Sequence, residues 1–330
     1  MEDSQNIHSD DFKDTHEIIN GTEAGIIYAM SNLGDTALIG LDTGYYELNK
    51  MTDGLKKGSV TVIAARPSMG STALALNIAN SLLQKESGVA IFSFEMSAED
   101  MMLRLISTRT SISLQKLRLG KIDSEQFKLI NSAMEIMKKG CEKLFIYDQG
   151  TIDIDQICTK LRKLKSQNPD LDLVIIDCLQ MIKISAGETV GEISSQLKML
   201  ARELDIPIII LSKLSSKLEL RSNKRPMLSD IPASDLIEPY TDTILLIYRD
   251  NLYQYHEEKT REKKAIAAGK DFISHYVEKA EDEAEIIIAK QRNGSIGHIK
   301  LMFQREFARF VDRYTFGNIQ LVDTSVNIAN

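Results

Sequence analysis

Residues 60–79 contain the groups best suited to binding an anion. A mostly apolar run at 60–63 leads into a short turn, and a helix-compatible run with Leu74, Leu76 and Ile78 follows. A strand, a tight turn and a helix in this order direct backbone N–H groups to one point, where the helix dipole also favours negative charge. The order predicts a phosphate-binding loop.

The loop departs from the common pattern at its charged position. That pattern, G-x-x-x-x-G-K-[ST], combines a lysine for the phosphates with a hydroxyl for Mg²⁺. Here Gly70 and Thr72 match, whereas Ser71 stands in place of the lysine. This removes charge-assisted hydrogen bonds of about 1.5–3 kcal/mol each. The predicted nucleotide-binding residues are Ala65, Arg66, Pro67, Ser68, Met69, Gly70, Ser71 and Thr72.

Polar residues end three further apolar runs. Glu95 lies at the end of 89–96, Asp177 ends 171–177, and Ser212 ends 207–212. In a parallel sheet, ligands bind beyond the carboxyl ends of the strands. We therefore expect Asp177 to hold Mg²⁺ together with Thr72, and Glu95 to accept a proton from an attacking water. Either acid alone could equally be a solvated turn residue, but their order after the loop favours a site.

Composition and charge exclude several classes of protein. The 330 residues are 43% hydrophobic and 26% charged, as in ordinary globular proteins, and no apolar run approaches the roughly 20 residues of a membrane helix. The polar, acidic start is unlike a secretory or transit signal. Cys141, Cys158 and Cys178 lack metal-ligand spacing, which favours reduced thiols in a cytoplasmic protein. We expect no role at a membrane.

The net charge of −7 is unevenly distributed. Residues 1–24 hold seven acidic side chains and one lysine, so the remainder of the chain is nearly neutral. A local basic strip that contacts nucleic acid is therefore compatible with the sequence.

Hydrophobic periodicity predicts alternating strands and helices after the loop. Further strands are expected at 144–148, 243–249, 285–290 and 298–303, and helical segments at 98–120, 124–139, 154–165 and 190–204. Strands that alternate with helices predict an α/β fold with a mostly parallel twisted sheet, flanked by helices, around one core.

Composition also suggests how the chain is organised. We expect an acidic tail at 1–10, a linker helix and connecting segment at 11–44, and one large domain at 45–330. Within this domain, residues 255–283 are dense in Lys, Glu and Ala and are expected to form a charged surface insertion.

From about residue 11 to residue 310, the chain resembles the C-terminal motor of DnaB-type replicative helicases. These are hexameric, RecA-like P-loop ATPases that move on single-stranded DNA. Other RecA-like ATPases, of the recombination and circadian types, share the fold, but the segments KRPMLSD and KQRNG of this chain resemble the helicases more closely. The matching segments are AARPSMG, VAIFSFEM, LVIIDCLQM, KMLARELDIPIIILS, AEIIIAKQRNG and KRPMLSD. The N-terminal domain of that family is not expected in this sequence.

The resemblance implies roles for individual residues and implies ATP and Mg²⁺ as cofactors. Thr72 and Asp177 would hold the metal, and Glu95 would be the catalytic glutamate. Lys290 and Arg292 resemble the residues that reach the γ-phosphate bound by the adjacent subunit. Without the resemblance, that pair would be interpreted as solvated residues beside a hairpin turn.

Several departures from the family pattern lie at its functional positions. Besides Ser71, Lys213 replaces the glutamine that senses the γ-phosphate, and Pro232 lies where the DNA-binding loop L-R-E-S-G would be, without an N–H for a phosphate. We hypothesise that Lys213 supplies the positive charge lost at Ser71, which makes it a further catalytic candidate.

Two classes of function follow. The first is an enzyme: a homo-hexameric ATP-driven translocase on single-stranded DNA. The second is a catalytically impaired paralogue that acts as a nucleotide-binding module or joins a mixed ring with an intact helicase. Candidate DNA contacts flank the altered loop, although each alone could be a solvated basic residue: Lys217, Arg221, Lys224 and Arg225.

Overall fold

The computed structural model describes residues 14–31, 38–139, 143–185, 187–274, 276–277 and 279–313. The expected acidic tail at 1–10 and the thiol of Cys141 lie outside these residues. The chain divides into two units, Met1–Ile39 and Gly40–Asn330. The first contains helix α1 (Thr15–Ser31), and its isoleucines Ile18, Ile19, Ile26 and Ile27 are all more than half exposed. No described helix is long and apolar enough to cross a bilayer.

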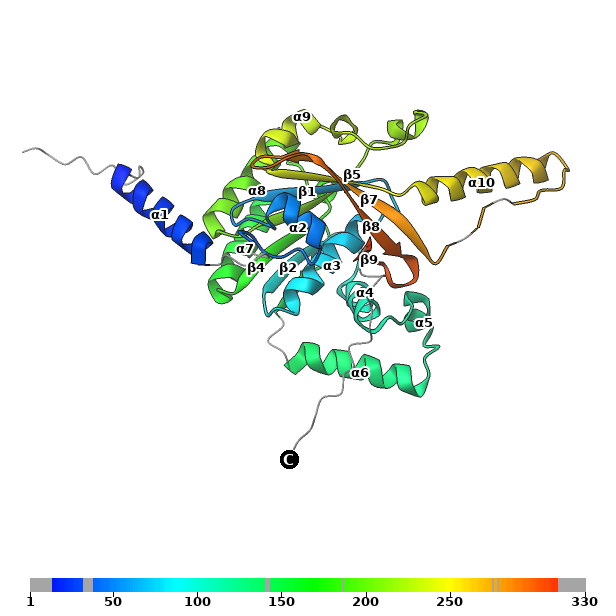
Figure 1. Ribbon diagram of the computed structural model, residues 1–330, viewed down its shortest axis with the longest axis horizontal. Helices are drawn as coiled ribbons and strands as arrows, with labels where there is room; N and C mark the ends of the chain where they lie inside the picture. Colours follow the sequence, from blue (N-terminus) through cyan, green and yellow to red (C-terminus); the bar gives the residue numbers. More distant parts are fainter. Residues whose placement is uncertain are drawn as a thin grey trace, which may run out of the picture. The chain divides into compact units, whose positions relative to one another are not determined.

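A single sheet organises the second unit (Figure 1). Its first six strands in spatial order pair in parallel and its last three pair antiparallel, which confirms the predicted mostly parallel α/β fold. In the described part of the chain, the order is β3 (Leu144–Tyr147), β2 (Gly88–Ser93), β4 (Leu171–Asp177), β5 (Ile208–Lys213), β1 (Val60–Ala65), β6 (Thr243–Tyr248), β7 (Glu281–Gln291), β8 (Gly297–Gln304) and β9 (Arg309–Asp312).

Helices cover both faces of this sheet. Side chains alternate between the faces along β1: Ile63 packs with α3 and α4, whereas Val62 packs with α7 and α8. The longer helices in this unit are α3 (Ser71–Leu83), α4 (Ala98–Thr110), α6 (Ser124–Lys139), α7 (Ile154–Gln167), α8 (Val190–Leu204) and α10 (Asp250–Ala267). The shorter ones are α2 (Tyr46–Thr52), α5 (Leu114–Leu119) and α9 (Ser234–Ile237).

Some elements differ from those expected. The helical segment at 98–120 divides into α4 and α5, because Ser111 is left-handed and the Ser113 side chain caps a new helix. Strand β7 begins at Glu281 rather than residue 285, since Asp282 forms a buried ion pair that the apolar pattern does not reveal. Strand β9 was not predicted. The charged block at 255–283 includes most of α10, which extends away from the sheet (Figure 1), and the first residues of β7.

The loop between β1 and α3 requires a glycine at position 70. Gly70 has φ = +107°, and a Cβ there would lie 2.9 Å from Cζ of Phe310. Gly120 has a comparable positive φ of +63°, but a Cβ there would meet nothing within 4 Å. A comparison of alanine substitutions at these two glycines therefore separates the cost of backbone strain from the cost of steric overlap.

We predict that Gly120→Ala lowers the free energy of unfolding by about 1–2 kcal/mol, the cost of a left-handed alanine. Gly70→Ala should lower it by about 1–3 kcal/mol more, because the added methyl group overlaps Phe310. Urea denaturation of both variants measures the difference. Equal losses would contradict the steric contribution.

Candidate functional site

The predicted phosphate loop connects the carboxyl end of β1 to the first residue of α3. Ser68 has φ = +68° and Gly70 has φ = +107°, so the backbone turns sharply before the helix begins at Ser71. The Leu74 N–H donates to the Gly70 carbonyl at 2.8 Å, which continues the helical pattern back into the loop. The first N–H groups of a helix have no acceptors within the helix. The loop therefore has the geometry of an anion site.

Thr72 and Asp177 come together at this loop. Thr72 Oγ1 donates to Asp177 Oδ2 at 2.9 Å, and Asp177 is only 7% exposed. Burial raises the pKa of Asp177, while the Thr72 hydrogen bond and the charges of Lys213 and Arg104 act in the opposite direction. A cation bound beside this carboxylate would favour its ionised form.

The donor chemistry of this pair fits Mg²⁺. The ion prefers hard oxygen ligands and commonly keeps only one or two protein ligands, with phosphate and water completing its shell. A hydroxyl and a buried carboxylate meet that requirement. In the part of the chain that the structure describes, no group of three or more His, Cys, Asp or Glu side chains could hold a metal by itself.

Lys213 and Glu95 contact each other at the same edge of the sheet. Lys213 lies opposite Ala65 in the β1–β5 register, and its Nζ donates to Glu95 Oε1. This hydrogen bond raises the pKa of Lys213, so the ammonium is charged at neutral pH. Gln180 fixes the end of β5 by donating to Ser212 Oγ at 2.8 Å and accepting from the Lys213 N–H at 3.1 Å.

Lys290 and Arg292 lie beside the amino-terminal ends of strands β1 and β6, whereas the loop lies at the carboxyl-terminal end of β1. Gln291 pairs with Thr243 at the start of β6, beside the start of β1, whereas the loop follows the end of β1. The length of β1, about 16 Å between its first and last Cα atoms, therefore separates them from their own loop. Within one chain, the structure does not bring this pair to the other predicted catalytic residues.

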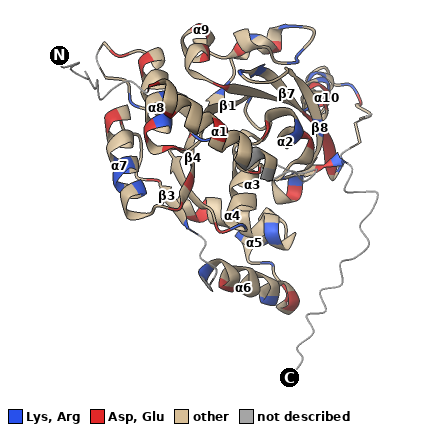
Figure 2. Cartoon of the chain, turned by 60° about the vertical axis from the view of Figure 1, so that its left-hand side comes forward, with Lys and Arg blue, Asp and Glu red and all other residues tan. Residues whose placement is uncertain are grey.

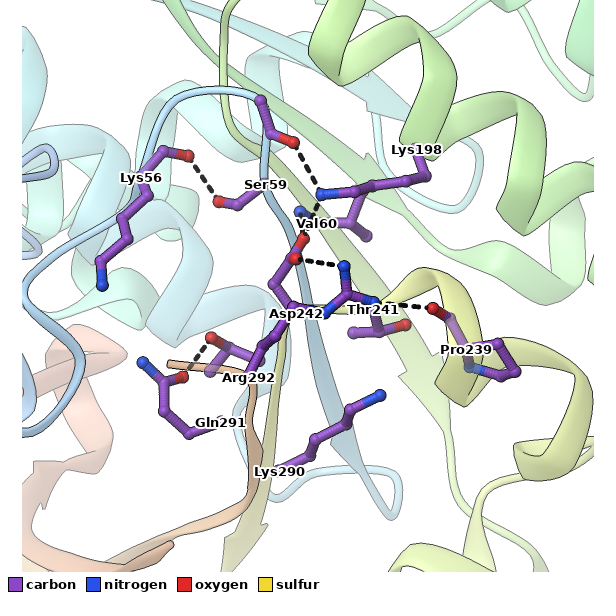
Figure 3. Close-up of polar contacts among 12 residues, drawn as sticks. Lys56, Ser59, Val60, Lys198, Pro239, Thr241, Asp242, Lys290, Gln291 and Arg292 are labelled. Carbon is purple, nitrogen blue, oxygen red and sulfur yellow. Dashed lines mark hydrogen bonds and ion pairs between the residues drawn. The ribbon is translucent and has the colours of Figure 1, made fainter. Parts of the chain in front are cut away.

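The surroundings of Lys290 and Arg292 are polar (Figure 3). Arg292 Nη2 donates to the Pro239 carbonyl at 2.9 Å, as drawn there. Lys290 Nζ donates to the Glu238 carbonyl. Partial burial lowers the pKa of Lys290. Both cations are thus held by backbone oxygens at the end of a short helical turn.

Asp242 is the centre of the contacts drawn in Figure 3. Its Oδ2 accepts from the Val60 N–H at 2.8 Å and from Lys198 Nζ at 2.6 Å, and its Oδ1 lies 3.4 Å from Arg292 Nη1. The Asp242 and Lys198 side chains are only 16% and 17% exposed, whereas Arg292 is 46% exposed. Asp242 therefore anchors the beginning of β1 through its contacts with Val60 and Lys198, and Arg292 lies at the exposed side of this group.

Most predicted DNA contacts are engaged within the chain. Arg221 pairs with Asp230 at 2.8 Å, Lys224 pairs with Glu257 at 2.6 Å, and Arg225 pairs with Glu285. Lys217 is exposed in the turn Ser216–Leu220. Figure 2 shows basic residues scattered among acidic ones over several helices. Of the four candidates, Lys217 is the most accessible to a phosphate.

One residue of the loop environment was missed from the sequence. Arg249 follows β6 directly and donates to the Ser68 carbonyl at 2.9 Å. Its signal was a charged residue at the end of an apolar strand, the same signal that indicated Glu95 and Asp177. The loop residue Arg66 is also fixed, since it donates to the Leu214 carbonyl at 2.8 Å.

The sheet and the loop together define a domain with the RecA-like P-loop fold: a mostly parallel sheet with an anion loop after β1 and a buried carboxylate ending β4. The family model of the DnaB-like helicase C terminal domain matches residues 40–312. The chain belongs to this family, which confirms the resemblance seen in its motifs.

Individual relatives agree. The chain is 38% identical over 319 residues to the replicative DNA helicase DnaB of Helicobacter pylori (strain ATCC 700392 / 26695), covering 91% of this chain and 65% of that protein. It is 39% identical to the DnaB of Geobacillus stearothermophilus, covering 94% of this chain and 64% of that protein. The chain thus spans about two thirds of the length of these relatives.

Solved structures are similar over most of the chain. The ATPase domain of G40P has a TM-score of 0.78 at 32% identity and covers 92% of this chain and 99% of that one. A DnaB-like replicative helicase, described with its interactions with primase, has a TM-score of 0.73 at 33% identity and covers 92% of this chain and 67% of that one.

We predict different stability effects for Asp242 and its partner Arg292 (Figure 3). Asp242→Ala should lower the free energy of unfolding by about 2–4 kcal/mol, somewhat less than for a fully buried pair, because Lys198 loses its carboxylate. Arg292→Met should cost less than about 1 kcal/mol, since the Arg292 side chain is nearly half exposed and its ion pair is screened by water. Urea denaturation provides both values, and a large loss for Arg292→Met would show that this arginine is needed for folding.

Proposed function

We propose that this chain is the ATP-driven motor domain of a replicative DNA helicase, and that a ring of six copies couples hydrolysis to movement along single-stranded DNA and to duplex unwinding. The main support for this proposal is the contact between Thr72 and Asp177 beside the phosphate loop, with Glu95 at the same carboxyl-terminal end of the strands. Membership of the DnaB-like family supports the proposal.

Each side of the proposed active site has a separate task. The loop N–H groups bind the phosphates, and Thr72 and Asp177 hold Mg²⁺, which neutralises charge on the phosphate oxygens when bound. Glu95 orients the attacking water and accepts its proton. Cysteine chemistry has no part in this proposal, since burial raises the pKa of Cys178 to about 11.

Lys213 is the proposed substitute for the missing loop lysine. It lies beside Ala65, at the base of the loop, and its flexible side chain is 49% exposed. A lysine ammonium on a four-carbon stem can move between Glu95 and a phosphate oxygen, whereas the Ser71 hydroxyl has no such reach. The pairing with Glu95 keeps the charge at the site that needs it.

The position of Lys290 and Arg292 supports action on a neighbouring subunit. Because they lie at the far end of β1 from their own loop, they are available to ATP bound by an adjacent copy. Such a cation stabilises charge on the transferring phosphoryl group. Hydrolysis would then require the ring.

The apolar face of α1 supports ring assembly. Ile18, Ile19, Ile26 and Ile27 are exposed on this helix. A groove of about 530 Å³ elsewhere in the chain is lined by apolar residues that include Met102, Met134, Met137, Leu144 and Ile146. We propose that α1 of one copy docks in the groove of the next, because burying both apolar surfaces is favourable.

A second candidate is an impaired paralogue that binds nucleotide without turnover and joins a mixed ring with an intact helicase. The observation that favours it is the pairing of Lys213 with Glu95 next to a loop whose lysine is Ser71. An ammonium held by the proposed base would leave both groups unavailable for chemistry.

Steady-state ATP hydrolysis, with and without single-stranded DNA, distinguishes the two. We expect turnover by the unmodified protein, and Lys213→Ala should lower kcat/KM at least about tenfold, since one charge-assisted hydrogen bond is worth about 1.5–3 kcal/mol. Lys163→Ala, an exposed lysine on α7, is the matched control and should leave turnover unchanged.

Other outcomes have definite meanings. Unchanged turnover in Lys213→Ala would exclude that residue as the substitute cation. No turnover by the unmodified protein but activity in Ser71→Lys would favour the impaired paralogue. No turnover in either protein would mean that a substitution outside the phosphate loop also impairs hydrolysis, and Pro232 is the first candidate.

DNA contact is tested through the salt dependence of binding to a fluorescent oligo(dT). Each phosphate contact contributes about −0.7 to the slope of log K against log salt for a single strand. We expect Lys217→Ala to reduce the slope by about that amount, because Lys217 is exposed, and Lys163→Ala to leave it unchanged. A slope near zero for the unmodified protein would contradict phosphate contacts altogether.

A further inference from the structure

We propose that Arg249 is a positioning residue for the phosphate loop: its buried guanidinium holds the Ser68 and Met69 carbonyls, and so fixes the turn in which the Met69 N–H donates to the Arg66 carbonyl and sets the direction of the Gly70 N–H. The proposal rests on the nucleotide site proposed above. It adds a residue outside the loop, and the ion pair that fixes it, to the machinery of binding.

The contacts of Arg249 divide its donors between two tasks. Nε and Nη2 donate to Oδ2 and Oδ1 of Asp282 at 2.8 and 3.0 Å. Nη1 donates to the Ser68 carbonyl at 2.9 Å and lies 3.5 Å from the Met69 carbonyl oxygen. The two paired side chains are 2% and 1% exposed, so the interaction is removed from water.

The planar guanidinium makes this division possible. Its fork binds a carboxylate with two parallel hydrogen bonds and still leaves donors on the remaining nitrogen. A lysine ammonium is a point charge that cannot hold the same bidentate geometry. Because Asp282 fixes the plane of the guanidinium, the position of Nη1 is fixed as well.

Holding the carbonyls determines the direction of the amides. In a trans peptide, the C=O and the following N–H lie in one plane and point in opposite directions. The Met69 carbonyl shares its peptide with the Gly70 N–H, so a carbonyl turned toward Arg249 turns that N–H away from it. The left-handed conformation of Ser68, which is unfavourable for a residue other than glycine, persists only where the surrounding structure holds it.

Aromatic rings complete that support. The Arg249 guanidinium carbon lies 4.0 Å from the centroid of the Phe303 ring, and the Phe303 and Phe310 rings are 4.6 Å apart. Phe310 in turn lies against Gly70. Strands β7, β8 and β9 thus provide the carboxylate and the rings on which the loop rests.

The opposing interpretation is an ion pair that contributes only to global stability. The two differ in what a variant changes. A purely structural pair lowers the melting temperature and affects the whole domain, whereas a positioning residue alters the loop beyond the effect of any equally destabilising change. Leu161→Ala is a suitable control, because Leu161 is fully buried in the cluster on the other face of the sheet.

The experiment compares the unmodified protein, Arg249→Met, Arg249→Lys and Leu161→Ala. Amide hydrogen exchange of the peptide covering 66–74 is measured without nucleotide, and affinity for a fluorescent ATP analogue is measured with Mg²⁺. At a matched loss of melting temperature, we expect the loop amides of Arg249→Met to exchange about tenfold faster than those of Leu161→Ala. We also expect Arg249→Met to bind the analogue about tenfold more weakly than Leu161→Ala does. Arg249→Lys should be intermediate.

A double variant removes the concern that an unpaired Asp282 unfolds the protein. Arg249→Met with Asp282→Leu eliminates the buried charge. Regained melting temperature with a loop that still exchanges fast would support positioning, whereas regained loop protection would overturn it, as would loop exchange in Arg249→Met no faster than in Leu161→Ala. If the unmodified protein binds no ATP analogue, the proposed nucleotide site fails, and the exchange measurement still decides whether Arg249 holds the loop.

Discussion

The buried ion pair between Arg249 and Asp282 joins the two halves of the sheet at the place where the phosphate loop lies. Arg249 follows the last parallel strand, and Asp282 belongs to the first antiparallel one. Two charges in such a place are tolerated only when all their hydrogen-bonding groups are satisfied. The Ser68 carbonyl meets one of those needs, which makes the loop part of the same network as the sheet.

On the other side of the loop, a second set of contacts forms the chemical part of the site. Thr72 meets Asp177, and Lys213 meets Glu95, through the ends of three parallel strands and the start of one helix. The substitution at Ser71 thus lies among groups that could replace its charge. Whether the domain is a motor or an impaired paralogue depends on how freely one ammonium moves between these partners.

Much of this could be predicted from local sequence. Helices α6 and α8 and strand β4 have the bounds expected from their apolar periodicity, and the Thr189–Glu192 capping box defines the start of α8. The carboxyl-edge position of Asp177 followed from strand direction alone. Ion pairs such as Arg221–Asp230 could not be predicted, because they depend on which charged side chains the folded loops bring together. The early start of β7 could not be predicted either, because its first residues are polar and Asp282 is buried only through its ion pair with Arg249.

The ends of the charged insertion have a consequence for how this family can vary. The chain leaves the sheet directly after Arg249 and returns to it at Glu281, next to Asp282. One ion pair therefore closes the base of the whole excursion, and the cost of a longer loop grows only slowly once its ends are held together. Segments of very different length can be exchanged at this point during evolution while the phosphate loop beneath keeps its shape.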